Sequence, residues 1–335
     1  MIRGVVACGL ACLAVALPAG AQSIAIEGTH SAGASSEELA AVGTQLRVFG
    51  DAGETLRGLR FQIEGSWGWR SEDEGDFFGA AYPYGGAVDL MEAYGEYVVE
   101  HRGWVRAVKG GRYRTPFGIS AASDHAYIGF LRAPLIRYGE YYALSNMYLE
   151  QGADVVIGKP RLSVEGSVGA PGDVGEAIRR PGTTAVVRTQ AVLGAWVLGA
   201  SYIDTTPYMP ARFASGRARF GGVDVRWMSD GVLARGEWLG GQPFEGTRTT
   251  GGYADLIVHR PAMGPVTAFG RAERLVYDAI PPFALSTHRY TAGARIRLWR
   301  TVALSPGVVY QGGQLTQHRR TAFDLGLSGS WRRNF

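Results

Sequence analysis

Residues 59–69 read LRFQIEGSWGW, and the two faces of this stretch differ in kind. One parity holds Leu59, Phe61, Ile63, Gly65, Trp67 and Trp69, and the other holds Arg60, Gln62, Glu64, Ser66 and Gly68. Successive side chains of a β-strand point to opposite faces, so this alternation predicts a strand with one apolar and one polar side. Helical spacing does not fit it.

The same period of two recurs along much of the chain. It is seen in residues 162–168, 223–227, 232–238 and 290–298. The composition of the 335 residues, 46% hydrophobic and 19% charged, excludes a disordered chain. A formal net charge of +4 is too dilute for a nucleic-acid-binding surface, and we expect no nucleic acid among the partners. The chain is therefore expected to be an all-β protein.

The first 21 residues have the pattern of a secretory signal peptide. Arg3 precedes an apolar run from Val5 to Leu17, and Ala19-Gly20-Ala21 is a typical cleavage site. We expect residues 1–21 to be the signal peptide and residues 22–335 to be a single mature domain. Both cysteines of the chain, Cys8 and Cys12, lie inside the signal. Disulfide scaffolds and thiolate metal sites are thereby excluded for the expected mature chain.

Connection lengths distinguish two ways of building an exported β protein, a soluble sandwich and a membrane barrel. After residue 21 no apolar run approaches the roughly 18 to 20 residues of a membrane helix. Short links are expected at 101–102, 158–160, 194–195, 229–231, 261–264 and 300–301, and longer links at 70–87, 116–149, 171–183, 205–216, 242–248, 278–286 and 313–320. Short and long links alternate, as periplasmic turns and extracellular loops do in an outer-membrane barrel.

Alternation marks fifteen strands, and a sixteenth is needed if both chain ends are periplasmic. The strands are expected at 23–29, 43–51, 57–69, 88–100, 103–115, 150–158, 161–170, 184–193, 195–204, 217–228, 231–241, 249–260, 265–277, 287–298, 301–312 and 321–335. The predicted fold is a transmembrane antiparallel up-and-down β-barrel of about sixteen strands. Because the link between 51 and 57 is longer than the other turns, fourteen or eighteen strands stay open.

The end of the chain and the tryptophans support a place in the outer membrane. Residues 323–335 alternate and finish on Phe335, and this ending resembles the terminal signal that the barrel assembly machinery reads in bacterial outer-membrane proteins. The eight tryptophans lie near the ends of the expected strands, as expected for aromatic girdles at the two membrane interfaces. We therefore expect the cell outer membrane of a Gram-negative bacterium, reached through the cleaved signal.

A sixteen-stranded barrel is too wide for side chains to fill its interior, so the lumen is expected to hold water. Inward parity predicts that the pore is lined by arginines and by carboxylates of the opposite sign. The candidates are Arg47, Arg60, Arg106, Arg112, Arg114, Arg188, Arg226, Arg235, Arg295 and Arg297, with Glu64, Glu96 and Glu237 among the acids. Arginine-rich linings favour anions. The alternative is that inward arginines and acids only neutralise each other across strands.

Residues 110–119 read GGRYRTPFGI and lead into the longest link, 116–149. At this point the chain resembles outer-membrane porins of the sixteen-stranded type and, more loosely, the phosphate-selective group. In these porins a strand ending near a Pro-Phe-Gly turn feeds a loop folded into the channel. The lysine-rich ladder of the phosphate-selective group is not matched, because Lys109 falls on outward parity and Lys159 in a turn.

The resemblance implies a constriction loop that brings charged side chains to the channel centre. Its members would be Asp124, Arg132, Arg137 and Glu140, with His125 also carried on the loop. We expect Arg112, Arg114, Arg132 and Arg137 to form the positive side of the constriction, facing Asp124 or Glu140. The alternative is an exposed extracellular loop held by its aromatic residues.

The function expected from these features is a porin, a passive channel for ion transport and for small hydrophilic solutes, with mild anion preference. Two alternatives stay open: a plugged structural or adhesive barrel, and an exported soluble β protein. An enzyme is not expected, because the six histidines occur singly and no G-x-S-x-G or H-x-x-x-H pattern is present. No cofactor and no metal is implied. The expected partners are outer-membrane lipid, small hydrophilic or anionic solutes, the barrel assembly machinery and, as in many porins, a homotrimer.

Overall fold

The computed structural model describes most of the chain after residue 22. The described residues are 23–35, 40–52, 58–70, 88–119, 129–132, 134–137, 149–171, 182–206, 217–243, 246–280, 283–314 and 320–334. The expected signal peptide, 1–21, lies outside them. Short 3-10 turns occur at η1 (Leu135–Arg137) and η3 (Pro261–Met263). Among the described residues, no helix is long and apolar enough to cross a membrane.

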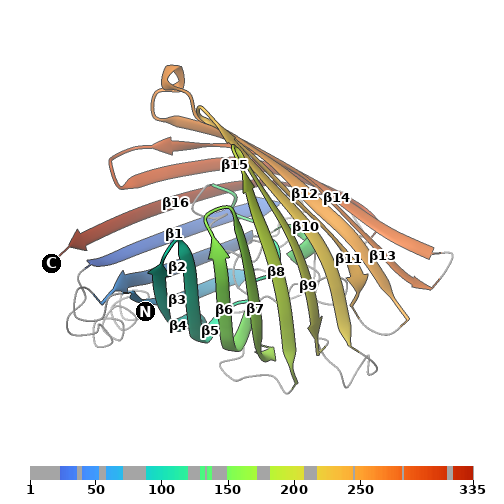
Figure 1. Cartoon of the computed structure of the whole chain (residues 1–335). Coiled ribbons are helices and arrows are strands. Elements are labelled where there is room, and N and C mark those ends of the chain that lie inside the picture. Colours follow the sequence, from blue (N-terminus) through green and yellow to red (C-terminus); the bar gives the residue numbers. More distant parts are fainter. Residues whose placement is uncertain are drawn as a thin grey trace.

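Sixteen strands form one closed antiparallel barrel, as the alternation predicts (Figure 1). They are β1 (Ser23–Ser35), β2 (Ala40–Asp51), β3 (Leu59–Arg70), β4 (Val88–His101), β5 (Trp104–Arg114), β6 (Leu149–Lys159), β7 (Leu162–Pro171), β8 (Thr184–Leu193), β9 (Trp196–Thr205), β10 (Ala218–Ser229), β11 (Val232–Gln242), β12 (Arg248–Val258), β13 (Val266–Ile280), β14 (Phe283–Arg297), β15 (Val302–Gly313) and β16 (Arg320–Asn334). Each strand pairs with its neighbours in sequence, and β1 pairs with β16 to close the cylinder. Ser23 at the start of β1 is in register with Asn334 at the end of β16, so these two residues lie at the same end of the barrel.

The strand bounds differ from the expected ones mainly at the end of β1, which runs to Ser35 rather than to residue 29, and between β13 and β14. A longer link was expected at 278–286, but β13 runs to Ile280 and β14 begins at Phe283. Ile280 is in register with Phe283, and the pairing shifts once between Asp278 and Ile280. The polar and proline residues of this segment obscure the alternation, whereas the hydrogen-bonded hairpin continues through it.

The outer face of the barrel carries exposed apolar side chains at one parity of strands β4–β12 and β14–β16. The members of this apolar band include Tyr97, Val108, Val155, Ile157, Leu162, Val164, Val187, Leu198, Tyr202, Val223, Trp238, Leu256, Tyr290, Val308, Phe323, Leu325, Leu327 and Trp331. Soluble proteins rarely expose apolar side chains over so large an area. Such a band fits the hydrocarbon of a membrane, with every backbone group of the strands paired inside the closed sheet.

Candidate functional site: the barrel interior

The inward parity of strands β1–β7 is a wall of polar side chains, which we call the polar wall. It includes Glu27, Thr29, Ser31, Gln45, Arg47, Gln62, Glu64, Ser66, Glu92, Glu96, Lys109, Glu150, Asp154, Glu165 and Ser167. The inward parity of strands β8–β13, the loop wall, mixes charges with large apolar residues. The two walls differ because the link between β5 and β6 packs against the loop wall.

The link between β5 and β6 turns into the barrel and binds the loop wall through its backbone. The amide of Gly118 donates to Oγ of Ser201 at 3.0 Å, and the amide of Ile119 donates to Oε2 of Glu237 at 3.0 Å. Farther along the link, the amide of Leu135 donates to Oε1 of Glu273 at 2.8 Å. These hydrogen bonds satisfy loop backbone groups that are buried away from water.

Apolar side chains of the same link pack on the loop wall and form a core inside the barrel. The link contributes Phe117, Ile119, Leu135 and Ile136, and the wall contributes Val186, Ile203, Ala218, Phe220, Leu239, Tyr253 and Leu275. The wall strands leave room for this core, since a Cβ on Gly222 would come within 2.9 Å of the Phe117 ring. Full burial of one such side chain stabilises the docked loop by about 1.5–3 kcal/mol.

A buried ion pair fastens the middle of the loop to the last strand. Nε and Nη2 of Arg132 donate to the two carboxylate oxygens of Asp324 at 2.7 and 2.5 Å. The backbone oxygen of Arg132 accepts a hydrogen bond from Arg271 at 3.1 Å, and the rings of Phe130 and Phe269 pack at 4.8 Å between centroids. The loop therefore reaches from the end of β5 across the lumen to β13 and β16.

Ion pairs across the sheet neutralise buried charges of the loop wall. Asp255 accepts from Arg235 at 2.8 Å and from Arg271 at 2.6 Å. Glu273 accepts from Arg289 at 2.7 Å, and Arg188 donates to Asp224 at 2.9 Å. All of these side chains are buried. Pairing and hydrogen bonding are what allow such charges to stay buried.

The polar wall carries pairs of the same kind, several of them more open to solvent. Arg114 is buried and lies 2.5 Å from Glu64 and 3.6 Å from Glu92. Arg47 is bonded to Glu27 across β1 and β2. Arg60 approaches Glu96 only at 4.0 Å, and its side chain is largely exposed.

The predicted orientation of two β5 residues, Arg106 and Lys109, is wrong. Arg106 is in register with Val99 and Ile157, both exposed on the outer face, so it does not line the pore. Lys109 was placed outward, but it lies 3.7 Å from Asp154 and 3.9 Å from Glu165 inside the barrel.

A break in the alternation explains both errors. Lys109 and Tyr113 have the same parity and both face the interior, where Tyr113 donates to Glu150 at 3.2 Å and Nζ of Lys109 lies 5.3 Å from the centre of the Tyr113 ring. Arg114 has the opposite parity, which faces outward at Arg106, yet it contacts inward Glu64. The parity read from the end of the strand therefore does not extend back to its start.

The remaining predicted pore-lining and loop residues are either buried, bonded to a polar neighbour, or outside the described residues. Arg112 is buried at the end of β5. Nη2 of Arg226 donates to Gln190 at 3.0 Å, while Arg295 touches Ser328 at 3.5 Å beside Arg297. Asp124, His125, Glu140 and the side chain of Arg137 lie outside the described residues.

Sequence reasoning missed five charged side chains of the interior, Glu150, Asp255, Arg271, Glu273 and Arg289. The inward parity of β13 also holds Phe269, Leu275 and Tyr277, which pack near the loop. That face therefore mixes apolar and charged residues and gives no clean alternation. The opposite face of β13 carries the exposed Arg274. Both faces therefore hold charged residues, and the sequence alone does not show which face points inward.

A closed sixteen-stranded antiparallel barrel with a long link folded into its lumen is the architecture of porins. Among solved structures, Salmonella typhi OmpF in complex with daunomycin has a TM-score of 0.67 at 10% identity, covering 93% of this chain and 98% of that one. OmpT of Vibrio cholerae in its trimer form gives 0.59 at 10% identity over 93% and 100%. A five-substitution variant of the Rh. blastica porin gives 0.51 at 14% identity over 92% and 99%.

These similarities establish a porin-type fold. At such low identity they speak to the fold and not to the solute, and they give no support to the phosphate-selective group. No family model and no curated protein matches the chain.

Proposed function

We propose that this protein is an outer-membrane porin, a passive channel through which small hydrophilic solutes diffuse down their gradients. The observation that supports this most strongly is the contrast between exposed apolar side chains on the outside of most strands and an interior lined by charged side chains. That combination suits a cylinder standing in lipid around an aqueous path. The porin-type fold agrees with it.

The path for water is proposed to follow the polar wall. The described parts of the loop contact β9–β13 and β16, whereas Gln45, Glu96 and Lys109 belong to strands on the other side of the cylinder. A loop that narrows the lumen without filling it would set the size of solute that passes. Charges in the narrowed part act more strongly because less water screens them.

A mild anion preference is proposed to come from Arg295 and Arg297 near the short-link end of β14. Arg295 contacts the Ser328 hydroxyl at 3.5 Å, and Arg297 is exposed. Within the described part of the chain, neither arginine forms an ion pair, whereas Arg188, Arg235 and Arg289 are each neutralised by a carboxylate. The preference should be weak because most arginines of the lumen are paired.

Planar-bilayer recording of the purified mature protein tests the proposal. Insertion should give stepwise ohmic conductance, and unequal KCl should give a reversal potential of the sign for modest chloride preference. Liposomes containing the protein should swell in small sugars and stop swelling as sugar size rises. A folded barrel that gives neither conductance nor swelling would support the plugged structural barrel instead.

A further inference from the structure

Two arginines lie together on the outer surface where β8, β9 and β10 meet the long links 172–183 and 206–217. Arg219 is in register with Asp204, and the same parity of β9 and β10 carries Tyr202 and Val223. Tyr202 is 47% exposed and Val223 is 59% exposed, so this parity faces away from the lumen. The arginine pair therefore faces outward, at the end of the apolar band.

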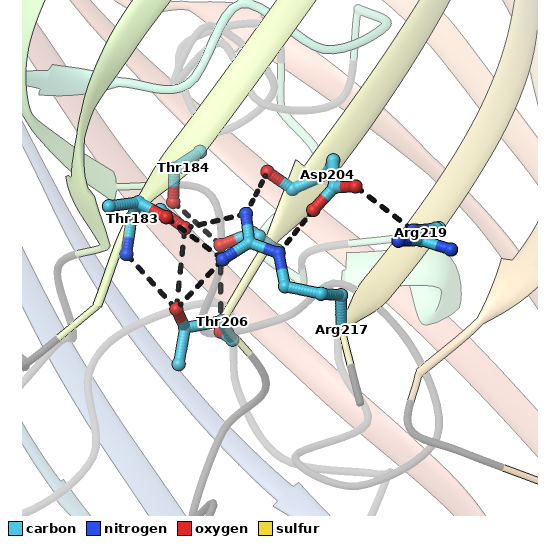
Figure 2. Close-up of polar contacts among 7 residues, drawn as sticks. Thr183, Thr184, Asp204, Thr206, Arg217 and Arg219 are labelled. Carbon is cyan, nitrogen blue, oxygen red and sulfur yellow. Dashed lines mark hydrogen bonds and ion pairs between the residues drawn. The ribbon is translucent and has the colours of Figure 1, made fainter. Parts of the chain in front are cut away.

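Arg217 is held in one position by a network of hydrogen bonds, shown in Figure 2. Its Nε donates to Asp204, Nη1 donates to the Thr183 hydroxyl at 2.8 Å, and Nη2 donates to the backbone oxygen of Asp204 at 3.1 Å. The Thr206 hydroxyl accepts from Nη1 at 3.4 Å. The network joins the three strands and fixes the carboxylate of Asp204.

Among the described residues, Arg219 forms its hydrogen bond through Nε, and its side chain is largely exposed. Its Nε donates to Oδ2 of Asp204 at 2.9 Å, on the opposite side of the carboxylate from Arg217 (Figure 2). The side chain is 58% exposed, against 34% for Arg217. Two guanidinium groups share one carboxylate, so the cluster is positive. An exposed guanidinium edge can bind a phosphate through two parallel hydrogen bonds.

A strip without side chains lies next to this cluster on the outer surface. Gly221, two residues farther along β10 and about 7 Å from Arg219 at the usual strand rise, is in register with Tyr202 on one side and Gly240 on the other. A Cβ on Gly221 would meet no atom within 4 Å. Exposed Tyr202 and Trp238 border the strip. A flat apolar strip between two aromatic residues has the width and chemistry to receive an acyl chain.

We propose that this surface, formed by Arg217, Arg219 and the strip at Gly221 and Gly240, binds a phosphorylated glycolipid of the outer leaflet. The phosphate of the glycolipid would bind the exposed edge of Arg219, and one of its acyl chains would lie on the strip. This inference rests on the proposed location in the outer membrane, in which long links lie outside and face the outer leaflet. It adds to the channel function a lipid site that surrounds the pore but does not open into it.

Binding of fluorescent lipid A, the bisphosphorylated acyl-glucosamine lipid, to the detergent-solubilised mature barrel tests the proposal. Arg219→Gln should weaken binding about tenfold, the value of one charge-assisted bidentate contact. Gly221→Leu fills the strip and should weaken binding several-fold without changing the charge. Arg161→Gln, an exposed arginine in the short link before β7, is the matched control and should leave the affinity unchanged.

Two further arms identify the chemistry of the ligand. Lipid A stripped of its phosphates should bind the wild-type barrel about as weakly as lipid A binds Arg219→Gln. Inorganic phosphate at the lipid concentration should not displace lipid A, because it lacks the acyl chains. Equal affinity of Arg219→Gln and wild type, undiminished binding of the stripped lipid, or full displacement by phosphate would overturn the proposal.

Conductance of each variant in phospholipid bilayers without glycolipid should equal that of the wild type. This measurement separates the two hypotheses, because a barrel can bind lipid A and yet fail to conduct, or conduct and yet fail to bind it.

Discussion

The polar wall and the loop wall are built from the same alternating strands, yet their inner faces differ. Inward residues of β1–β7 are mostly polar, whereas those of β8–β13 include Ile203, Phe220, Leu239 and Leu275, all essentially inaccessible to solvent. The exterior of both walls is apolar because both face the same surroundings. The interior differs because the described part of the loop packs its apolar side chains on β8–β13. Strand alternation therefore predicts the lipid-facing side of a strand. It predicts a polar inner side only where no loop packs on that side.

The largest expected effect comes from the ion pair that fastens the loop. Arg132→Ala leaves the buried Asp324 without its partner and should destabilise the docked loop by about 3–5 kcal/mol. Arg47→Ala, on the polar wall and partly open to solvent, should cost about 0–1 kcal/mol. Single-channel recording should show raised or fluctuating conductance for the first variant only. Identical, steady traces for both variants would mean that the pair does not hold the loop in place.

The apolar core of the loop wall should be the next most sensitive feature. Leu135→Ala removes a fully buried side chain from the core and should weaken loop docking by about 2–5 kcal/mol. Val187→Ala, on the outer face of β8, is the control and should change little. Limited proteolysis of the folded barrel measures the difference, with faster cleavage within 116–149 for Leu135→Ala. Equal cleavage rates would contradict the docked core.

The two faces of one strand allow a sharper test of the exterior. Val155→Arg puts a charge on the exposed face of β6 and should destabilise the barrel by about 2–4 kcal/mol near the middle of the membrane. Val156→Arg points the same charge inward, in register with Glu165, and should be tolerated. Urea unfolding in lipid vesicles gives both free energies. The assignment of faces fails if the two variants unfold alike.

The smallest expected effect concerns charge selectivity. Replacing Arg295 and Arg297 together with glutamine removes two lumen charges that form no ion pair within the described residues. The reversal potential in unequal KCl should move by a few millivolts toward cation preference, while conductance changes little. The double variant Arg235→Gln/Arg289→Gln is not a clean control, because it would strand buried Asp255 and Glu273. Arg161→Gln, which lies outside the lumen, is the control. An equal shift of the reversal potential in this variant would contradict the proposal that Arg295 and Arg297 set the anion preference.

Much of the fold could be predicted from the sequence, because period-two alternation is a local property of each strand. The predicted bounds lie within three residues of the observed ones except at the end of β1 and the start of β14, and the loop at 116–149 stands out by its length and its Pro-Phe-Gly start. The errors lie where local alternation fails. Near the end of β5 the alternation breaks between Tyr113 and Arg114, so the faces predicted for Arg106 and Lys109 are reversed.

The contents of the loop wall could not be predicted for a different reason. Inward Phe220 and Leu239 are apolar because Phe117 and its neighbours pack on them from far away in the sequence. Likewise, Arg132 meets Asp324 across 192 positions of the chain. Contacts of this kind are set by how the loop folds into the closed barrel, and no periodicity within a single strand reports them.

The central claim is that water follows the polar wall while the loop covers the other wall. Single cysteines test it most directly, because Cys8 and Cys12 precede the expected cleavage site and leave the mature chain without other thiols. Glu96→Cys on β4 and Leu239→Cys on β11 would be exposed, in conducting channels, to a charged, membrane-impermeant thiol reagent. We predict rapid modification with a drop in conductance for Glu96→Cys and no reaction for Leu239→Cys. Rapid modification of Leu239→Cys, or an unreactive Glu96→Cys, would contradict this account of the interior.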